Sequence, residues 1–69
     1  MAETVYEIIQ MVGTSSVGIE EAIRNAIQKA SETVKAIRWF EVVETRGSVE
    51  EGEVQTWQVT VKFGFPVED

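Results

Sequence analysis

Residues 37–65, IRWFEVVETRGSVEEGEVQTWQVTVKFGF, decide the fold of this chain. The last part of this segment alternates strictly between two sets of side chains, which is typical of a strand with one buried face. The set predicted to face the core is Gln55, Trp57, Val59, Val61, Phe63 and Phe65, and the set predicted to face away is Val54, Thr56, Gln58, Thr60 and Lys62. The segment therefore predicts two long strands joined by a polar turn.

The first strand of this hairpin carries an indole on the face opposite the core. Phe40 and Val42 alternate with Trp39 and Val43, so joining the first pair to the core leaves the second pair on the other face. A large aromatic side chain in that position needs a partner, which is either another subunit or a flat ligand.

The N-terminal half predicts one strand and one helix. Residues 3–12 are rich in β-branched and aromatic side chains, which favours a strand. Between residues 17 and 36, apolar residues recur at steps of three and four, which predicts an amphipathic helix with Ser16 as its N-cap. We expect a turn at residues 47–53 and the end of the last strand at Pro66.

This order of elements predicts an α+β fold of βαββ type. The expected sheet has three antiparallel strands in the spatial order 1-3-2, and one helix covers one face of it. Residues 1–69 are interpreted as a single domain. A domain of this size buries only about 60% of its unfolded surface. Because the chain has no Cys and no His, disulfides and the commonest zinc sites are excluded, which leaves oligomerisation to stabilise it.

Composition also narrows the classes of function. The net charge of −6 disfavours binding to nucleic acid and to anionic membrane surfaces. We find neither a signal-like N-terminus nor a membrane-length apolar run, so a cytoplasmic protein is expected. Without His and Cys the usual general bases and nucleophiles are missing, and we predict no catalytic residues and no metal site.

The outward-facing residues of the hairpin form a candidate binding patch. In the register that we expect, the cross-strand pairs are Trp39–Lys62, Glu41–Thr60, Val43–Gln58 and Thr45–Thr56. An indole beside an amide suits a planar heterocycle with imide-like edges. The alternative is that Trp39 anchors the interface of a structural or protein-interaction homo-oligomer without a ligand. Both hold if the pocket lies between subunits.

The motifs of the chain resemble those of the dodecins. The matching pieces are VGTS at 12–15, an Ala-rich helix, RWFEV at 38–42, ETRG at 44–47 and QVTVKFGF at 58–65, which cover nearly the whole chain in order. The resemblance implies a hollow homododecamer that binds flavins without catalysing a reaction. It also implies a role in flavin storage and photoprotection.

The resemblance assigns roles to individual residues. It implies that Trp39 stacks on the flavin and that Gln58 hydrogen-bonds the edge of the isoalloxazine ring, with Val43 and Thr45 in the same site. It implies that Arg46 holds the flavin phosphate, which favours FMN and leaves riboflavin and FAD open. Two positions that are usually cationic in dodecins of this type are instead Ser48 and Pro66. These two departures weaken the phosphate assignment and make coenzyme A a doubtful second ligand.

Overall fold

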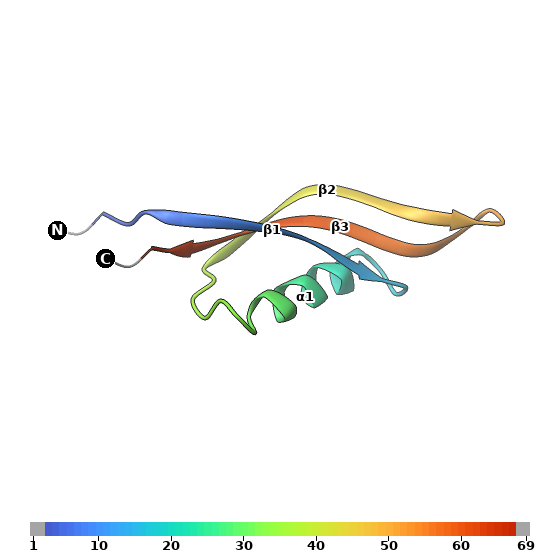
Figure 1. Cartoon of the computed structure of the whole chain (residues 1–69). Helices are drawn as coiled ribbons and strands as arrows, with labels where there is room; N and C mark the ends of the chain where they lie inside the picture. Colours follow the sequence, from blue (N-terminus) through green and yellow to red (C-terminus); the bar gives the residue numbers. More distant parts are fainter. Residues whose placement is uncertain (1–2, 68–69) are drawn as a thin grey trace.

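The computed structural model describes residues 3–67, which fold into three strands and one helix (Figure 1). The elements follow in the order β1 (Tyr6–Ser15), α1 (Ile19–Ala30), β2 (Trp39–Glu50) and β3 (Glu53–Pro66). The strands form one antiparallel sheet in the order β1-β3-β2. The predicted βαββ order, the central third strand and the end of that strand at Pro66 are therefore confirmed.

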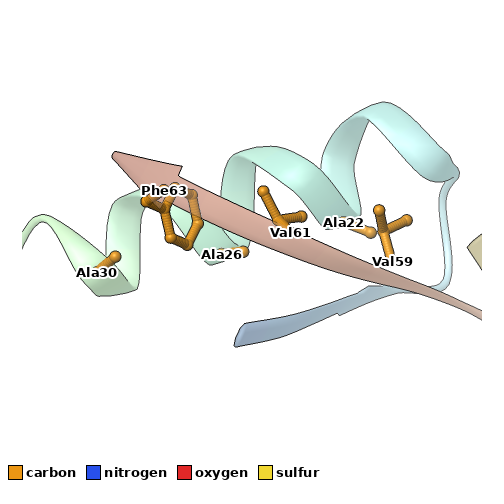
Figure 2. Close-up of a cluster of buried hydrophobic side chains, with 6 residues drawn as sticks. All are labelled: Ala22, Ala26, Ala30, Val59, Val61 and Phe63. Atoms are coloured by element: carbon orange, nitrogen blue, oxygen red, sulfur yellow. The ribbon is translucent and has the colours of Figure 1, made fainter. Parts of the chain in front are cut away.

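The core lies between α1 and the middle of β3 (Figure 2). Its six residues are at most 3% exposed, and they are Ala22, Ala26, Ala30, Val59, Val61 and Phe63. The helix contributes only alanines to this set, so its backbone can approach the sheet closely. At Gly13 the approach is so close that an added Cβ would collide with the carbonyl oxygen of Ala22. Gly13 is therefore the point where β1 passes directly under the helix.

The helix is shorter than the periodicity predicts, and Ser16 does not cap it. Gly18 is the N-cap residue and has no side-chain hydrogen bond, while β1 continues through Gly13 to Ser15. At the other end, the hydroxyl of Thr33 donates to the carbonyl of Ala30, a local bond that competes with helix continuation. Ile37 fits the apolar period of the predicted helix although it lies beyond the end of α1. It does so because it also packs against the core, from the segment that follows the helix.

A two-residue turn joins β2 to β3, much tighter than the predicted turn at 47–53. Glu51 and Gly52 both have positive φ, 52° and 79°. Two successive residues with positive φ suit the right-handed twist of a hairpin. As a result both strands extend far beyond the end of β1, which pairs with β3 only from Trp57 to Pro66. We call residues 47–56 the hairpin arm (Figure 1).

One copy of the chain is elongated and leaves much of its surface open. Its principal extents are 56 × 20 × 13 Å and its radius of gyration is 14.4 Å. A compact domain of this length has a radius of gyration of about 11 Å. The accessible surface of the chain is 5191 Å². A typical monomer of this mass exposes about 4300 Å². Every residue of β2 is exposed, so the shape is suited to burial by further copies.

Candidate functional site

The face of the sheet away from α1, which we call the outer face, carries most of the candidate residues. On β3, its members alternate with the buried residues. On β1 and β2, its members are the residues that the strand register pairs with that set of β3 residues. They are Tyr6, Ile8, Gln10, Val12 and Thr14 on β1, Trp39, Glu41, Glu44 and Arg46 on β2, and Gln58, Thr60, Lys62 and Gly64 on β3. The prediction that Trp39 lies away from the core of its own chain is therefore confirmed.

The indole of Trp39 lies directly against the backbone of β3. Trp39 is the cross-strand partner of Gly64, and a Cβ added to Gly64 would collide with Cε2 and Cζ2 of the indole. From β1, the ring of Tyr6 approaches with its centroid 6.1 Å from that of the indole, at an interplanar angle of 63°. Trp39 remains 37% exposed. The sheet thus supports the indole from below and leaves part of the ring free to stack.

Arg46 and Gln58 form a second, polar group on the outer face. The two residues are cross-strand partners, and Nε of Arg46 donates a hydrogen bond of 2.8 Å to Oε1 of Gln58. Arg46 is exposed and Gln58 is half-buried. The amide and the guanidinium together offer donors and an acceptor to a polar ligand.

The strand register differs from the predicted one for two reasons: the hairpin turns at Glu51 and Gly52, and β2 contains a bulge at Val43. A second register shift lies between Ser48 and Val49. Trp39 pairs with Gly64 and not with Lys62, and Gln58 pairs with Arg46 and not with Val43. The bulge inserts one unpaired residue, so the faces of β2 are exchanged after it. Thr45, which we expected on the outer face, pairs with Val59 and belongs to the helix side.

The indole and the Arg46–Gln58 pair lie far apart within one chain. Gly64 and Gln58 are six residues apart on β3. That separation corresponds to about 20 Å at the usual rise of a strand. Such a span exceeds the length of a three-ring heterocycle. Within one chain, Trp39 and Gln58 therefore do not lie side by side, and the site predicted around Trp39, Val43, Thr45 and Gln58 stays a prediction for an assembly. Within residues 3–67, moreover, no enclosed pocket is formed.

Two residues of the indole support were missed by sequence reasoning. Gly64 had a usable signal, since a glycine inside a strand often marks a close approach by another group. Tyr6 lies in a strand whose two faces both carry apolar residues, so alternation did not show that its ring reaches Trp39. The neighbouring Ile8 and Val12 are exposed on the same face. This apolar surface around the indole suits contact with another subunit.

Two kinds of feature are absent from residues 3–67. Among residues 3–67, no three side chains of His, Cys, Asp or Glu gather closely enough to hold a metal ion. In the same range, no helix is long and apolar enough to cross a membrane.

Comparison with known proteins gives one consistent result. The dodecin family model matches residues 5–68. The dodecin of Thermus thermophilus is 42% identical over 65 residues, which are 94% of each chain. The solved structure of dodecin from Streptomyces coelicolor has a TM-score of 0.93 and 43% identity, covering 100% of this chain and 99% of that one. Dodecin from Streptomyces davaonensis has a TM-score of 0.91 and 44% identity, covering 99% and 100%.

Proposed function

This chain belongs to the dodecin family, and we propose that it stores flavin between the tryptophans of neighbouring subunits in a cytoplasmic homododecamer. Dodecins are small binding proteins that form homo-oligomers and have no enzymatic activity. The observation that carries the proposal is the indole of Trp39. It lies on the outer face and is partly free. Along the sheet of its own chain it is far from the Arg46–Gln58 pair that suits a flavin edge.

The assembly is supported by the surface that one copy leaves open. The outer face exposes Tyr6, Ile8 and Val12 beside Trp39, and the uncovered strand β2 exposes Phe40 and Val42. A 69-residue chain with so small a core gains stability if further copies bury these apolar groups. In this arrangement the outer faces of neighbouring subunits would enclose a narrow cleft at each Trp39.

The ligand is held by residues from different subunits. Trp39 of one copy supplies the aromatic surface, and Gln58 of another copy supplies hydrogen bonds to the polar edge of the ring. Val43, the unpaired residue of the bulge, lies between these two positions along β2 and is exposed. Thr45 is on the helix side and is not part of this proposal.

The proposed site would also protect the flavin from light. A flavin held there would supply a ring that light can excite, and the indole of Trp39 would lie where it can quench that excited state by electron transfer. Trp39 is suited to this role because Gly64 and Tyr6 fix its position before any ligand arrives.

FMN is our first choice of ligand, with riboflavin and FAD as alternatives. Two Nη groups of Arg46 remain available for a phosphate after its Nε has bonded Gln58. Ser48 and Pro66 carry no positive charge, so we do not propose coenzyme A as a ligand.

Titration of riboflavin, FMN and FAD against the purified protein, with native mass measured in parallel, tests the proposal. We expect quenching of flavin fluorescence and a particle of twelve 7.7 kDa chains. Trp39→Ala should abolish the quenching. Trp57→Phe is the matched control, because Trp57 alternates with Gln58 and lies on the helix side. A large particle without flavin uptake would favour a structural homo-oligomer, and unchanged affinity in Trp39→Ala would contradict the site.

A further inference from the structure

We propose that Arg46 is a positioning residue, which holds the Gln58 side chain so that its amide group presents N–H donors to the carbonyl edge of the flavin ring. This inference rests on the proposed function and adds a role for Arg46 that does not depend on a phosphate.

The hydrogen bond between the two side chains fixes which end of the amide faces Arg46. Nε of Arg46 meets Oε1 of Gln58 at 2.8 Å. A guanidinium group has only donors, so the atom of Gln58 that it meets is the oxygen. The bond is charge-assisted and therefore stronger than one between neutral groups. The amide NH₂ group of Gln58 must then point away from Arg46.

This orientation of the Gln58 amide determines which edge of a ligand it can bind. A free glutamine side chain rotates about its last torsion and presents either its oxygen or its NH₂ group. With Arg46 on the oxygen, the exposed end carries two N–H donors, and the second lone pair of the oxygen remains for one further donor. Ring carbonyl oxygens beside an imide N–H match that pattern, whereas an amino edge does not.

The bulge at Val43 is what brings the two side chains together. Without the extra residue, Arg46 would share the face of Phe40 and Val42 and would point to the helix side of the sheet. With it, Arg46 pairs with Gln58 on the outer face. Bulges commonly aim a side chain at a functional site.

The positioning role predicts an effect on a ligand without a phosphate. Arg46→Ala should weaken riboflavin about tenfold, for one lost hydrogen bond of this kind. It should weaken FMN at least as much, because FMN also loses the proposed phosphate contact. Arg46→Lys should restore most of the riboflavin affinity, because an ammonium group can also donate to Oε1. Gln58→Glu keeps a partner for Arg46 but has no N–H donor, so it should weaken both ligands at least as much as Gln58→Ala.

The experiment measures riboflavin and FMN affinities by fluorescence quenching for the wild type, Arg46→Ala, Arg46→Lys, Gln58→Ala and the double variant Arg46→Ala/Gln58→Ala. Positioning through Gln58 requires that Arg46→Ala has no further effect on riboflavin once Gln58 is alanine. If Arg46→Ala weakens FMN but leaves riboflavin unchanged, Arg46 is only a phosphate contact and the proposal is overturned. The same conclusion follows if its riboflavin effect persists in the Gln58→Ala background.

A readout without ligand separates this proposal from the proposed function. Crystal structures of the flavin-free wild type and of Arg46→Ala should show one ordered Gln58 orientation in the first and loss of that orientation in the second. An unchanged Gln58 side chain in Arg46→Ala would overturn the positioning role. If the wild type binds neither flavin, the proposed function fails, while the orientation of Gln58 still decides what Arg46 does.

Discussion

The two ends of the outer face hold their functional side chains in different ways. At one end, Trp39 lies on the backbone of Gly64 and beside the ring of Tyr6, so contacts from two other strands fix it. At the other end, one hydrogen bond links Arg46 to Gln58, next to the point where the three-stranded sheet becomes the two-stranded hairpin arm. The comparison teaches that, in the proposed site, the stacking side chain and the side chains that would bind the ring edge have separate supports.

Because the two ends are held differently, we expect substitutions at each end to have different effects on stability and on flavin affinity. Substitutions around Trp39 alter tight packing, so they should change stability and flavin affinity together. Substitutions of Arg46 or Gln58 remove an exposed or half-buried polar contact, so they should change affinity with little effect on stability. The following predictions test that contrast, from the largest effect to the smallest.

Replacement of Gly64 by valine should have the largest effect. The new side chain occupies the space of the indole. Gly64→Val should therefore abolish flavin quenching and lower the free energy of unfolding by about 1–3 kcal/mol. In a Trp39→Ala background the space is free, and valine is the better strand former. There, urea titration should show Gly64→Val to be neutral or stabilising. A destabilisation of the same size in both backgrounds would contradict the indole contact.

Mixed assemblies test whether the two ends act in trans. Homo-oligomers of Trp39→Ala and of Gln58→Ala should each bind flavin poorly. If equal amounts are unfolded and reassembled together, about a quarter of the sites should combine an intact Trp39 with an intact Gln58 from a neighbouring copy. Flavin uptake should recover accordingly, as measured by fluorescence. No recovery in particles shown by native mass spectrometry to be mixed would place both residues in one subunit.

Removal of the Tyr6 ring should have a moderate effect. An edge-to-face aromatic pair contributes about 0.5–1.5 kcal/mol, so Tyr6→Ala should weaken flavin binding severalfold and lower stability by a similar free energy. Tyr6→Phe keeps the ring and should behave as the wild type in both measurements. If Tyr6→Phe is as impaired as Tyr6→Ala, the hydroxyl and not the ring contact matters.

The tip of the hairpin arm should show the smallest effect. Glu51 adopts a φ of 52°. A positive φ of this kind costs a non-glycine residue about 1 kcal/mol. Glu51→Gly should therefore raise the free energy of unfolding by up to about 1 kcal/mol and leave flavin affinity unchanged. Glu50→Gly, inside β2, is the control and should lower stability. A fall in flavin affinity for Glu51→Gly would connect the tip to the binding site.

The sequence was sufficient for the topology because alternation and helical period are strong signals. The alternation around Val59, Val61 and Phe63 identified the buried side of β3, and its length identified the central strand. Trp39 was placed on the correct face for the same reason. Gly64 carried a signal that was not used, since a glycine there breaks the run of larger residues on β3.

The register could not be predicted, because a single extra residue changes it without changing the composition of the strand. Val43 is a valine beside another valine, and nothing in that pair identifies the bulge. The tight turn at Glu51 and Gly52 was also hidden, since glutamate is unusual at a positive φ. These two features moved Thr45 off the outer face, brought Arg46 onto it and separated Gln58 from Trp39.

A crystal structure of the protein with bound FMN tests the central claim most directly. The account predicts that each isoalloxazine ring stacks on Trp39 of one subunit and accepts a hydrogen bond from Gln58 of another. A ring that contacts Trp39 and Gln58 of the same chain, or one that stacks on Trp39 with Gln58 out of reach, would contradict it.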